Sequence, residues 1–233
     1  GCDGVIGYGG GSSLDTAKTL AALATNTGDL RSYLNLPPKE DNIKRRPLPT
    51  VAVPTTSGTG ADISPGCVVI DGEYKSLFSS SRMYPDVSIV DPVLTLTCPP
   101  NVTASSGVDA LSHAIDSMLS NEVNPLCDSI ALGAIQLISR NLRTAYFDGD
   151  DLHARSEMAL AATMAGIAMS IANSSWPAHL LAEAIGPKYK IPHGVACGLA
   201  LPYMMTFFQP ACADRIASIG SAFGIQSGEM PAN

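Results

Sequence analysis

The sequence changes character once, at the Pro99–Pro100 pair, and this change constrains the fold more than any other feature. Before the pair, short apolar runs of strand length alternate with turns and one helical stretch, which is typical of an α/β layer. After it, the apolar runs repeat with the period of a helix. The predicted strands cover residues 5–8, 50–53, 67–70 and 87–90, the predicted loop covers 36–47, and the predicted helices cover 14–24, 129–142, 152–171, 178–185 and 194–208. We therefore expect an α/β lobe over residues 1–99 and an all-helical lobe over residues 100–233.

Composition excludes several classes of protein. The net charge of −7 argues against nucleic-acid binding, which favours a basic patch. The longest uncharged stretch, residues 158–182, is interrupted at 173–177, and the part before the break predicts a buried core helix rather than a membrane span. Six cysteines without paired spacing predict free thiols in the cytoplasm or another reducing compartment. Because a predicted strand follows Gly1 almost directly, we expect a piece of a longer protein.

Asp109 and His113, an acid and a histidine four residues apart, are the most informative pair of side chains. Residues at this spacing share one face of a helix. A carboxylate oxygen and an imidazole nitrogen suit a divalent ion such as Fe²⁺, Mn²⁺ or Zn²⁺. Such a pair more often forms a surface contact, but Leu111 and Ile115 are among the neighbours that make this helix largely apolar. A titratable pair in those surroundings needs a partner or a metal.

Two further histidines, His179 and His193, could close a metal site with this pair. One carboxylate and three imidazoles could leave room on the ion for a substrate oxygen, which a catalytic metal needs. Each of these histidines taken alone is more often a satisfied core or surface residue. Pro192 and Gly194 constrain the backbone around His193, where the ring could point inward.

The remaining histidine and one cysteine have simpler interpretations. His153 lies among charged residues and is predicted to face solvent. Cys197 follows His193 by four residues and so could be a ligand, but a core thiol is the commoner role for cysteine.

Two glycine-rich loops follow predicted strands, at residues 9–12 and 54–60. Glycines let the backbone approach a phosphate closely, and the start of a helix supplies free N–H groups. Short glycine motifs also serve as plain tight turns. Two such loops at the ends of neighbouring strands would form a polar crevice for a dinucleotide. Asp15 could cap the helix that follows the first loop or contact the ligand.

Four motifs occur in order and together resemble the iron-containing (group III) alcohol dehydrogenases. They are GGGSSLDTAK at 9–18, PTTSGTG at 54–60, Asp109-x3-His113, and Pro192-His193-Gly194, and the runs at 90–92 and 124–128 also fit. The resemblance covers most of the chain. It implies a dehydroquinate synthase-like architecture with an α/β dinucleotide-binding domain, incomplete here, and a helical metal-binding domain.

The resemblance also implies the site residues. Asp109, His113, His179 and His193 would hold the ion, usually Fe²⁺, with Zn²⁺ and Mn²⁺ as alternatives. NAD or NADP would lie along Gly10, Gly11, Ser12, Asp15, Thr55, Thr56, Thr59 and Leu94, with Lys75 as a weaker candidate. The substrate would be a small alcohol or aldehyde, and a homodimer is one possible assembly.

Two positions depart from the family pattern. Glu183 stands where members often carry a second histidine near the nicotinamide, and a carboxylate there could still relay a proton. Asp62 stands where a glutamate is common. The segment that selects NAD over NADP is absent from the chain. A dehydroquinate synthase-like lyase that uses Zn²⁺ and NAD, and a non-catalytic fragment, are the alternative interpretations.

Overall fold

The computed structural model describes residues 1–34, 43–71, 74–172 and 176–225. Its α/β part contains a parallel sheet of β1 (Val5–Gly9), β2 (Thr50–Pro54) and β5 (Val87–Ser88), in the order β1-β2-β5. β1 and β2 pair in register from Val5 opposite Thr50 to Gly9 opposite Pro54. Both strands therefore end at the same edge of the sheet, where the two glycine-rich loops begin.

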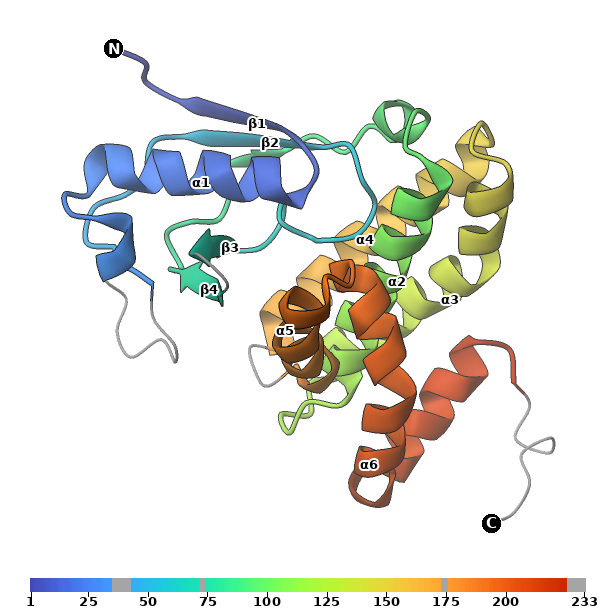
Figure 1. Ribbon diagram of the computed structural model, residues 1–233. Coiled ribbons are helices and arrows are strands. Elements are labelled where there is room, and N and C mark those ends of the chain that lie inside the picture. The colour runs from blue at the N-terminus through green and yellow to red at the C-terminus, as the bar shows by residue number, and fades with distance from the viewer. Residues whose placement is uncertain (35–42, 72–73, 173–175, 226–233) are drawn as a thin grey trace.

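Helix α1 (Gly11–Thr25) packs along β1 and β2 (Figure 1). A Cβ atom at Gly7 would lie 2.9 Å from the Cβ of Ala17 and 3.2 Å from a methyl of Leu14, so the glycine lets the helix approach the strand closely. The predicted strand at 5–8 and helix at 14–24 are confirmed, and the helix begins three residues earlier than predicted.

A two-stranded antiparallel ribbon, β3 (Gly66–Asp71) and β4 (Tyr74–Ser79), stands beside the sheet. The first strand was predicted and the second was not, because its sequence mixes lysine and serine with two apolar residues. The strand predicted at 87–90 is shorter than expected. After Ser88 the chain turns towards the short helix η2 (Pro92–Thr95), whose start Asp91 caps by accepting a hydrogen bond from Val93 N at 2.9 Å. Another short helix, η1 (Leu30–Ser32), follows α1.

The second part of the chain is mostly helical, and its described residues from 100 onwards contain no strand, which agrees with the prediction (Figure 1). Its elements are α2 (Pro100–Met118), α3 (Pro125–Phe147), α4 (Leu152–Ala172), α5 (Pro177–Tyr189) and α6 (His193–Ala222). Three of these helices begin at a proline, where the missing N–H costs no helical hydrogen bond. Their shared core is rich in alanine, which lets the helices pack closely. The stretch predicted as a core helix around residue 160 is α4, and ten of its residues are buried.

Three helices of this part, α3, α5 and α6, run several residues further than the sequence predicts. α3 begins at Pro125, where Asn124 caps it by accepting hydrogen bonds from the next backbone N–H groups, and α5 continues through Pro187. α6 passes Pro210 but breaks at Cys212, whose φ of −144° and ψ of 41° are not helical. By length and composition alone, α6 is apolar enough to cross a membrane. Part of the loop predicted at 36–47 lies outside the described residues.

The two parts of the chain meet through the 54–60 loop. Gly60 has φ of +61°, and a Cβ atom there would lie 2.8 Å from the Cα of Gly166 in α4. A Cβ atom at Gly58 would lie 2.6 Å from the carbonyl oxygen of Ser106 in α2. The loop therefore contacts α2 at Ser106, three residues before Asp109. The division of the chain into two domains at residue 99 stays a prediction.

Candidate functional site

Three helices bring together a cluster of possible metal ligands. Asp109 lies on α2, His179 on α5, and His193 and Cys197 on α6. One donor atom from each of these four residues lies within 4.8 Å of the others. The Oδ1 atom of Asp109 is 3.5 Å from Nε2 of His179 and 3.6 Å from Nε2 of His193. Three of the four predicted ligands therefore converge on one point.

Two atoms of this cluster are buried without a hydrogen-bond partner among the described residues. They are Oδ1 of Asp109 and Nε2 of His179, and their separation exceeds ordinary hydrogen-bond length. Buried polar atoms in folded proteins nearly always have partners. A divalent transition ion between them would satisfy both, and oxygen, nitrogen and sulfur donors suit such an ion. The residues present therefore fit the metal that the sequence predicts.

His113 lies beside this cluster rather than within it. Its ring stacks on that of His179, with centroids 4.3 Å apart and planes 11° from parallel. Its Nδ1 atom is buried without a hydrogen-bond partner in the described part of the chain. His113 therefore lies next to the ligand cluster with a nitrogen that could bind a metal. Its coordination of the ion stays a prediction.

Asp116 belongs to the site although the sequence analysis missed it. Its Oδ2 atom lies 2.8 Å from Nδ1 of His179, and its carboxylate accepts hydrogen bonds from the backbone N–H groups of Ala178 and His179. The side chain is completely buried. A carboxylate on Nδ1 leaves Nε2 of the same ring facing a metal, an arrangement common around protein metal sites. The signal was present in the sequence, because Asp116 follows Asp109 by seven residues and so shares its helix face.

The electrostatics of the cluster follow from burial and close charges. Burial acts to raise the pKa of Asp109, but the surrounding imidazoles outweigh it and hold that pKa well below its usual range. Burial, together with His179, lowers the pKa of His113 to about 4, so this ring is neutral at pH 7. Burial acts to lower the pKa of His179, but Asp109 and Asp116 raise it well above its usual value. Burial and the two carboxylates thus act on the pKa of His179 in opposite directions, and the carboxylates have the larger effect.

Two glycines of α6 allow this helix, which holds His193 and Cys197, to pack closely against α2. A Cβ atom at Gly194 would lie 1.9 Å from the carbonyl oxygen of Ser105, and one at Gly198 would lie 2.6 Å from a methyl of Val108. No larger residue fits at Gly194 unless the helices separate. The glycine that follows His193 is thus part of how the site is assembled.

The two glycine-rich loops meet at the edge of the sheet. Gly9 has φ of +140°, and its carbonyl accepts a hydrogen bond from Thr55 N at 2.9 Å. Gly10 is the N-cap of α1 and offers no side-chain cap. A Cβ atom at Gly10 would lie 3.6 Å from the Thr56 side chain, and one at Gly11 would lie 2.7 Å from a methyl of Thr59. The start of α1, whose first N–H groups have no partner within the helix, therefore lies beside threonines of the second loop, and helix starts of this kind suit a phosphate.

The other predicted cofactor residues lie around these loops. Ser12 is exposed in the first turn of α1, and Leu94 is partly buried in η2. Asp15 does not cap α1, so this one of its two alternative roles is wrong, while its contact with the cofactor stays a prediction. Its Oδ2 atom accepts a hydrogen bond from Val68 N at 2.9 Å, and its Oδ1 atom lies 3.3 Å from Nζ of the buried Lys18. Lys75 lies in β4, and its side chain lies outside the described part of the structure.

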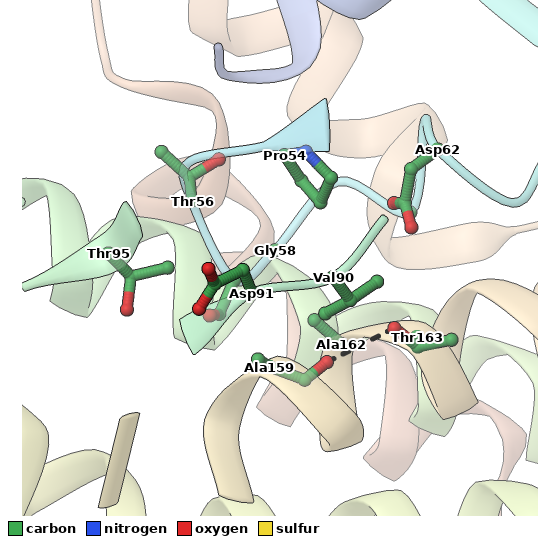
Figure 2. A pocket seen from close by; sticks show the side chains of 12 residues that line it. Pro54, Thr56, Gly58, Asp62, Val90, Asp91, Thr95, Ala159, Ala162 and Thr163 are labelled. Atoms are coloured by element: carbon green, nitrogen blue, oxygen red, sulfur yellow. Dashed lines mark hydrogen bonds between the residues drawn. The ribbon is translucent and has the colours of Figure 1, made fainter. Parts of the chain in front are cut away.

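A narrow cleft also borders the second loop. Figure 2 shows Thr56, Gly58 and Asp91 facing Ala159 and Thr163 of α4 across it. Asp62, which also lines the cleft, accepts a hydrogen bond from the Ser88 hydroxyl at 2.7 Å. The 54–60 loop thus borders both the start of α1 and this cleft.

Glu183, His153 and the cysteines are the remaining residues for which the sequence made a prediction. Glu183 is partly buried on α5, one turn after His179, and its role as a proton relay stays a prediction. His153 is exposed, as predicted. All six cysteines are free, also as predicted, but Cys197 lies in the ligand cluster rather than in a purely apolar core.

Comparisons with known proteins agree with this geometry. The profile described as iron-containing alcohol dehydrogenase matches residues 1–92, and that of the C-terminal part of the Fe-containing alcohol dehydrogenase family matches residues 103–233. The chain is 40% identical to long-chain-alcohol dehydrogenase 1 of Geobacillus thermodenitrificans over 222 residues, which is 95% of this chain and 56% of that protein. It therefore spans little more than half the length of such curated relatives.

Solved structures give the same result. The crystal structure of a 1,3-propanediol oxidoreductase aligns with a TM-score of 0.91 and 37% identity, over 98% of this chain and 59% of that one. A sulfoacetaldehyde reductase from Bifidobacterium kashiwanohense, solved in complex with NAD+, aligns with a TM-score of 0.82 and 30% identity, over 97% of this chain and 65% of that one.

Proposed function

The chain belongs to the iron-containing alcohol dehydrogenase family, and from this premise we propose that its protein is a metal- and NAD(P)-dependent dehydrogenase of small alcohols, or a reductase of the corresponding aldehydes. The observation that carries the proposal is the convergence of Asp109, His179 and His193, where Oδ1 of Asp109 and Nε2 of His179 are buried and have no hydrogen-bond partner among the described residues. The helix that holds Asp109 also contacts the 54–60 loop, so metal and cofactor would lie close together.

The candidate site residues form two groups, one that would bind the ion and one that would bind the nucleotide. Asp109, His113, His179 and His193 would hold the ion, with Fe²⁺ expected from the family and Zn²⁺ or Mn²⁺ as alternatives. Asp116 orients His179 through its 2.8 Å contact with Nδ1. When bound, the ion would supply Lewis acidity for the substrate oxygen, and NAD(P) would accept or donate the hydride.

The first turn of α1 would bind the pyrophosphate. Gly10, Gly11 and Ser12 present backbone N–H groups there, and the threonines of the second loop border the same space. Leu94 would lie along the cofactor. Asp15 would also lie near the cofactor, while its carboxylate accepts a hydrogen bond from Val68 N and pairs with Lys18. Turnover measured separately with NAD+ and with NADP+ determines which of the two dinucleotides the protein prefers.

Glu183 would move the proton that leaves the alcohol. It follows His179 by four residues and so shares the helix face that carries the metal ligand. A carboxylate in this position can accept a proton near the substrate oxygen.

The relatives do not favour the other two interpretations. Long-chain-alcohol dehydrogenase 1 and a 1,3-propanediol dehydrogenase, which are 40% and 39% identical to the chain, are named as dehydrogenases rather than lyases. A lyase of the dehydroquinate synthase type would also leave no net NADH. The homodimer and the cytoplasmic or otherwise reducing location are further expectations of the proposal.

The test uses the complete natural protein, loaded with metal and offered a panel of small alcohols with NAD+ or NADP+. We expect reduced cofactor to accumulate, and we expect His193→Ala to lose both metal and turnover. His153→Ala is the matched control, because this exposed histidine lies outside the cluster. Undiminished turnover in a metal-depleted His193→Ala variant would refute the assignment.

A further inference from the structure

Lys18 is a charged residue of α1 whose side chain is only 1% exposed. Burying an ammonium group is costly unless the group is paired and hydrogen-bonded. Its Nζ atom donates hydrogen bonds to the carbonyl oxygens of Ser64, at 3.1 Å, and of Gly66, and it lies 3.3 Å from Oδ1 of Asp15. Two carbonyl oxygens and one carboxylate thus surround the ammonium group inside the α/β part of the protein.

The backbone partners of Lys18 lie just after the second glycine-rich loop, where the chain enters β3. Ser64 follows the 54–60 loop by four residues, and Gly66 is the first residue of β3, which packs beside α1 (Figure 1). Asp15 adds a contact of the same kind, because its Oδ2 atom accepts a hydrogen bond from Val68 N at 2.9 Å. Residues three apart share one face of a helix. This face of α1 therefore holds the backbone of residues 64–68.

Other elements fix the earlier points of the same loop. At its start, the N–H group of Thr55 donates a hydrogen bond to the carbonyl oxygen of Gly9 at 2.9 Å. In its middle, the backbone of Gly58 lies close to α2 and that of Gly60 lies close to α4. Lys18 joins the chain that leaves the loop to the helix whose start would bind the pyrophosphate.

The position of this contact determines what its loss would change. Without Lys18, the contacts of the loop with α2 and α4 remain, but the end of the loop is no longer held on α1 by the ammonium group. A binding site that is already ordered loses less conformational entropy when its ligand binds. The candidate metal ligands lie on α2, α5 and α6, whereas the partners of Lys18 lie on α1 and around β3. Loss of Lys18 should therefore affect the cofactor and not the metal.

We propose that Lys18 is a positioning residue for the dinucleotide: it holds the end of the second glycine-rich loop on α1 and so keeps the two loops at the separation that the cofactor needs. This inference rests on the proposed function and adds a residue to its cofactor site. Lys18 acts through the backbone of residues 64–66, because its ammonium group is already surrounded by two carbonyl oxygens and a carboxylate.

The test compares Lys18→Met with Arg215→Met in the complete natural protein. Methionine keeps the length of the side chain but has no donor. Arg215 is the matched control, because it also joins two backbone carbonyls, those of Ser117 and Ser120, and a carboxylate, that of Asp128, but in the helical part.

Calorimetric titration with NAD+ and with NADP+ measures the Kd of each variant for the cofactor. We expect Lys18→Met to raise this Kd by about tenfold, while metal affinity and kcat at saturating cofactor stay within about twofold of wild type. Arg215→Met should lower Tm and leave the Kd for the cofactor unchanged.

Each outcome decides the inference. An unchanged cofactor Kd in folded Lys18→Met, or an equal loss of metal affinity, overturns the role of Lys18 while the proposed function stands. If the wild-type protein binds neither NAD+ nor NADP+, both fail. Should Lys18→Met fail to fold, hydrogen exchange of the wild-type protein decides. The backbone N–H groups of residues 64–68 should be equally protected with and without cofactor, and protection that appears only when the cofactor binds would overturn the inference.

Discussion

The Oδ2 atom of Asp116 lies 2.8 Å from Nδ1 of His179, and both side chains are buried where α2 meets the start of α5. The same carboxylate accepts hydrogen bonds from two backbone N–H groups in the first turn of α5. It therefore fixes both the helix and the ring that the helix carries. Nε2 of His179 is left directed at Asp109.

Asp116→Asn tests this positioning role. The amide keeps the size of the side chain but removes the charge, so we expect metal affinity to fall by about 10- to 100-fold. The measurement is a metal titration of the metal-free protein. Asp128→Asn is the control, because Asp128 of α3 pairs with Arg215 in the part of α6 beyond the break at Cys212, so the change should affect stability without changing metal affinity. Equal metal affinity in wild type and Asp116→Asn would contradict the assignment.

Gly194→Ala tests the close approach of α6 to α2. The added Cβ atom would lie 1.9 Å from the carbonyl oxygen of Ser105, so the helices must separate. We expect a loss of about 1–3 kcal/mol in the free energy of unfolding, together with loss of bound metal. Gly220→Ala in the same helix is the control, since nothing lies within 4 Å of its Cβ position. A Gly194→Ala protein with normal stability and metal content would show that the approach is not required.

Gly10→Ala separates cofactor binding from folding. The added Cβ atom meets nothing closer than 3.6 Å, and φ of −77° suits alanine, so stability should stay unchanged. If a pyrophosphate lies against this backbone, the methyl group blocks it, and we expect the Kd for NAD(P) to rise by about tenfold or more. Calorimetry of cofactor binding, with metal content as the internal control, measures the effect. Unchanged cofactor affinity would place the nucleotide elsewhere.

Asp86 gives the protein an acid-sensitive contribution to stability. Its carboxylate accepts hydrogen bonds from Thr50 N at 2.9 Å and from Arg46 Nη2 at 2.6 Å, and these contacts lower its pKa. Because the folded pKa lies below the unfolded value of about 3.9, the stabilisation is full above that value and disappears as pH falls through the folded pKa. We expect Asp86→Asn to lower the free energy of unfolding by about 1 kcal/mol at pH 7.

Urea unfolding at several pH values checks this expectation. The difference between wild type and Asp86→Asn should shrink below about pH 4. Arg46→Gln should cost less than Asp86→Asn, because the Arg46 side chain is 80% exposed and surface ion pairs contribute little. A difference that stays constant down to pH 2 would contradict the account.

The sequence predicted those parts of the fold in which local pattern and tertiary contacts agree. Strands β1, β2 and β3 are apolar runs bounded by glycine, proline or aspartate. β4 was missed because its stability comes from pairing with β3 rather than from its own apolar content. α6 was predicted too short: beyond residue 208 the chain passes Pro210, bends at Cys212 and continues as a helix.

The candidate site was only partly predictable for a related reason. Residues on one helix face can be read from their spacing, so Asp109 and His113 were found, and Asp116 could have been. Spacing does not say which other helices approach that face. The nearness of Cys197 to Asp109 depends on the contact of Gly194 with Ser105, which only the packed helices reveal.

The most direct measurement follows the hydride itself. Primary alcohols carrying deuterium on the carbinol carbon are incubated with NAD+ or NADP+ and the complete protein, with metal removed and then restored. We predict that deuterium appears on the nicotinamide ring only when metal is present. Transfer that is equally fast without metal, or no transfer to either cofactor from any alcohol by the metal-loaded protein, would contradict the account.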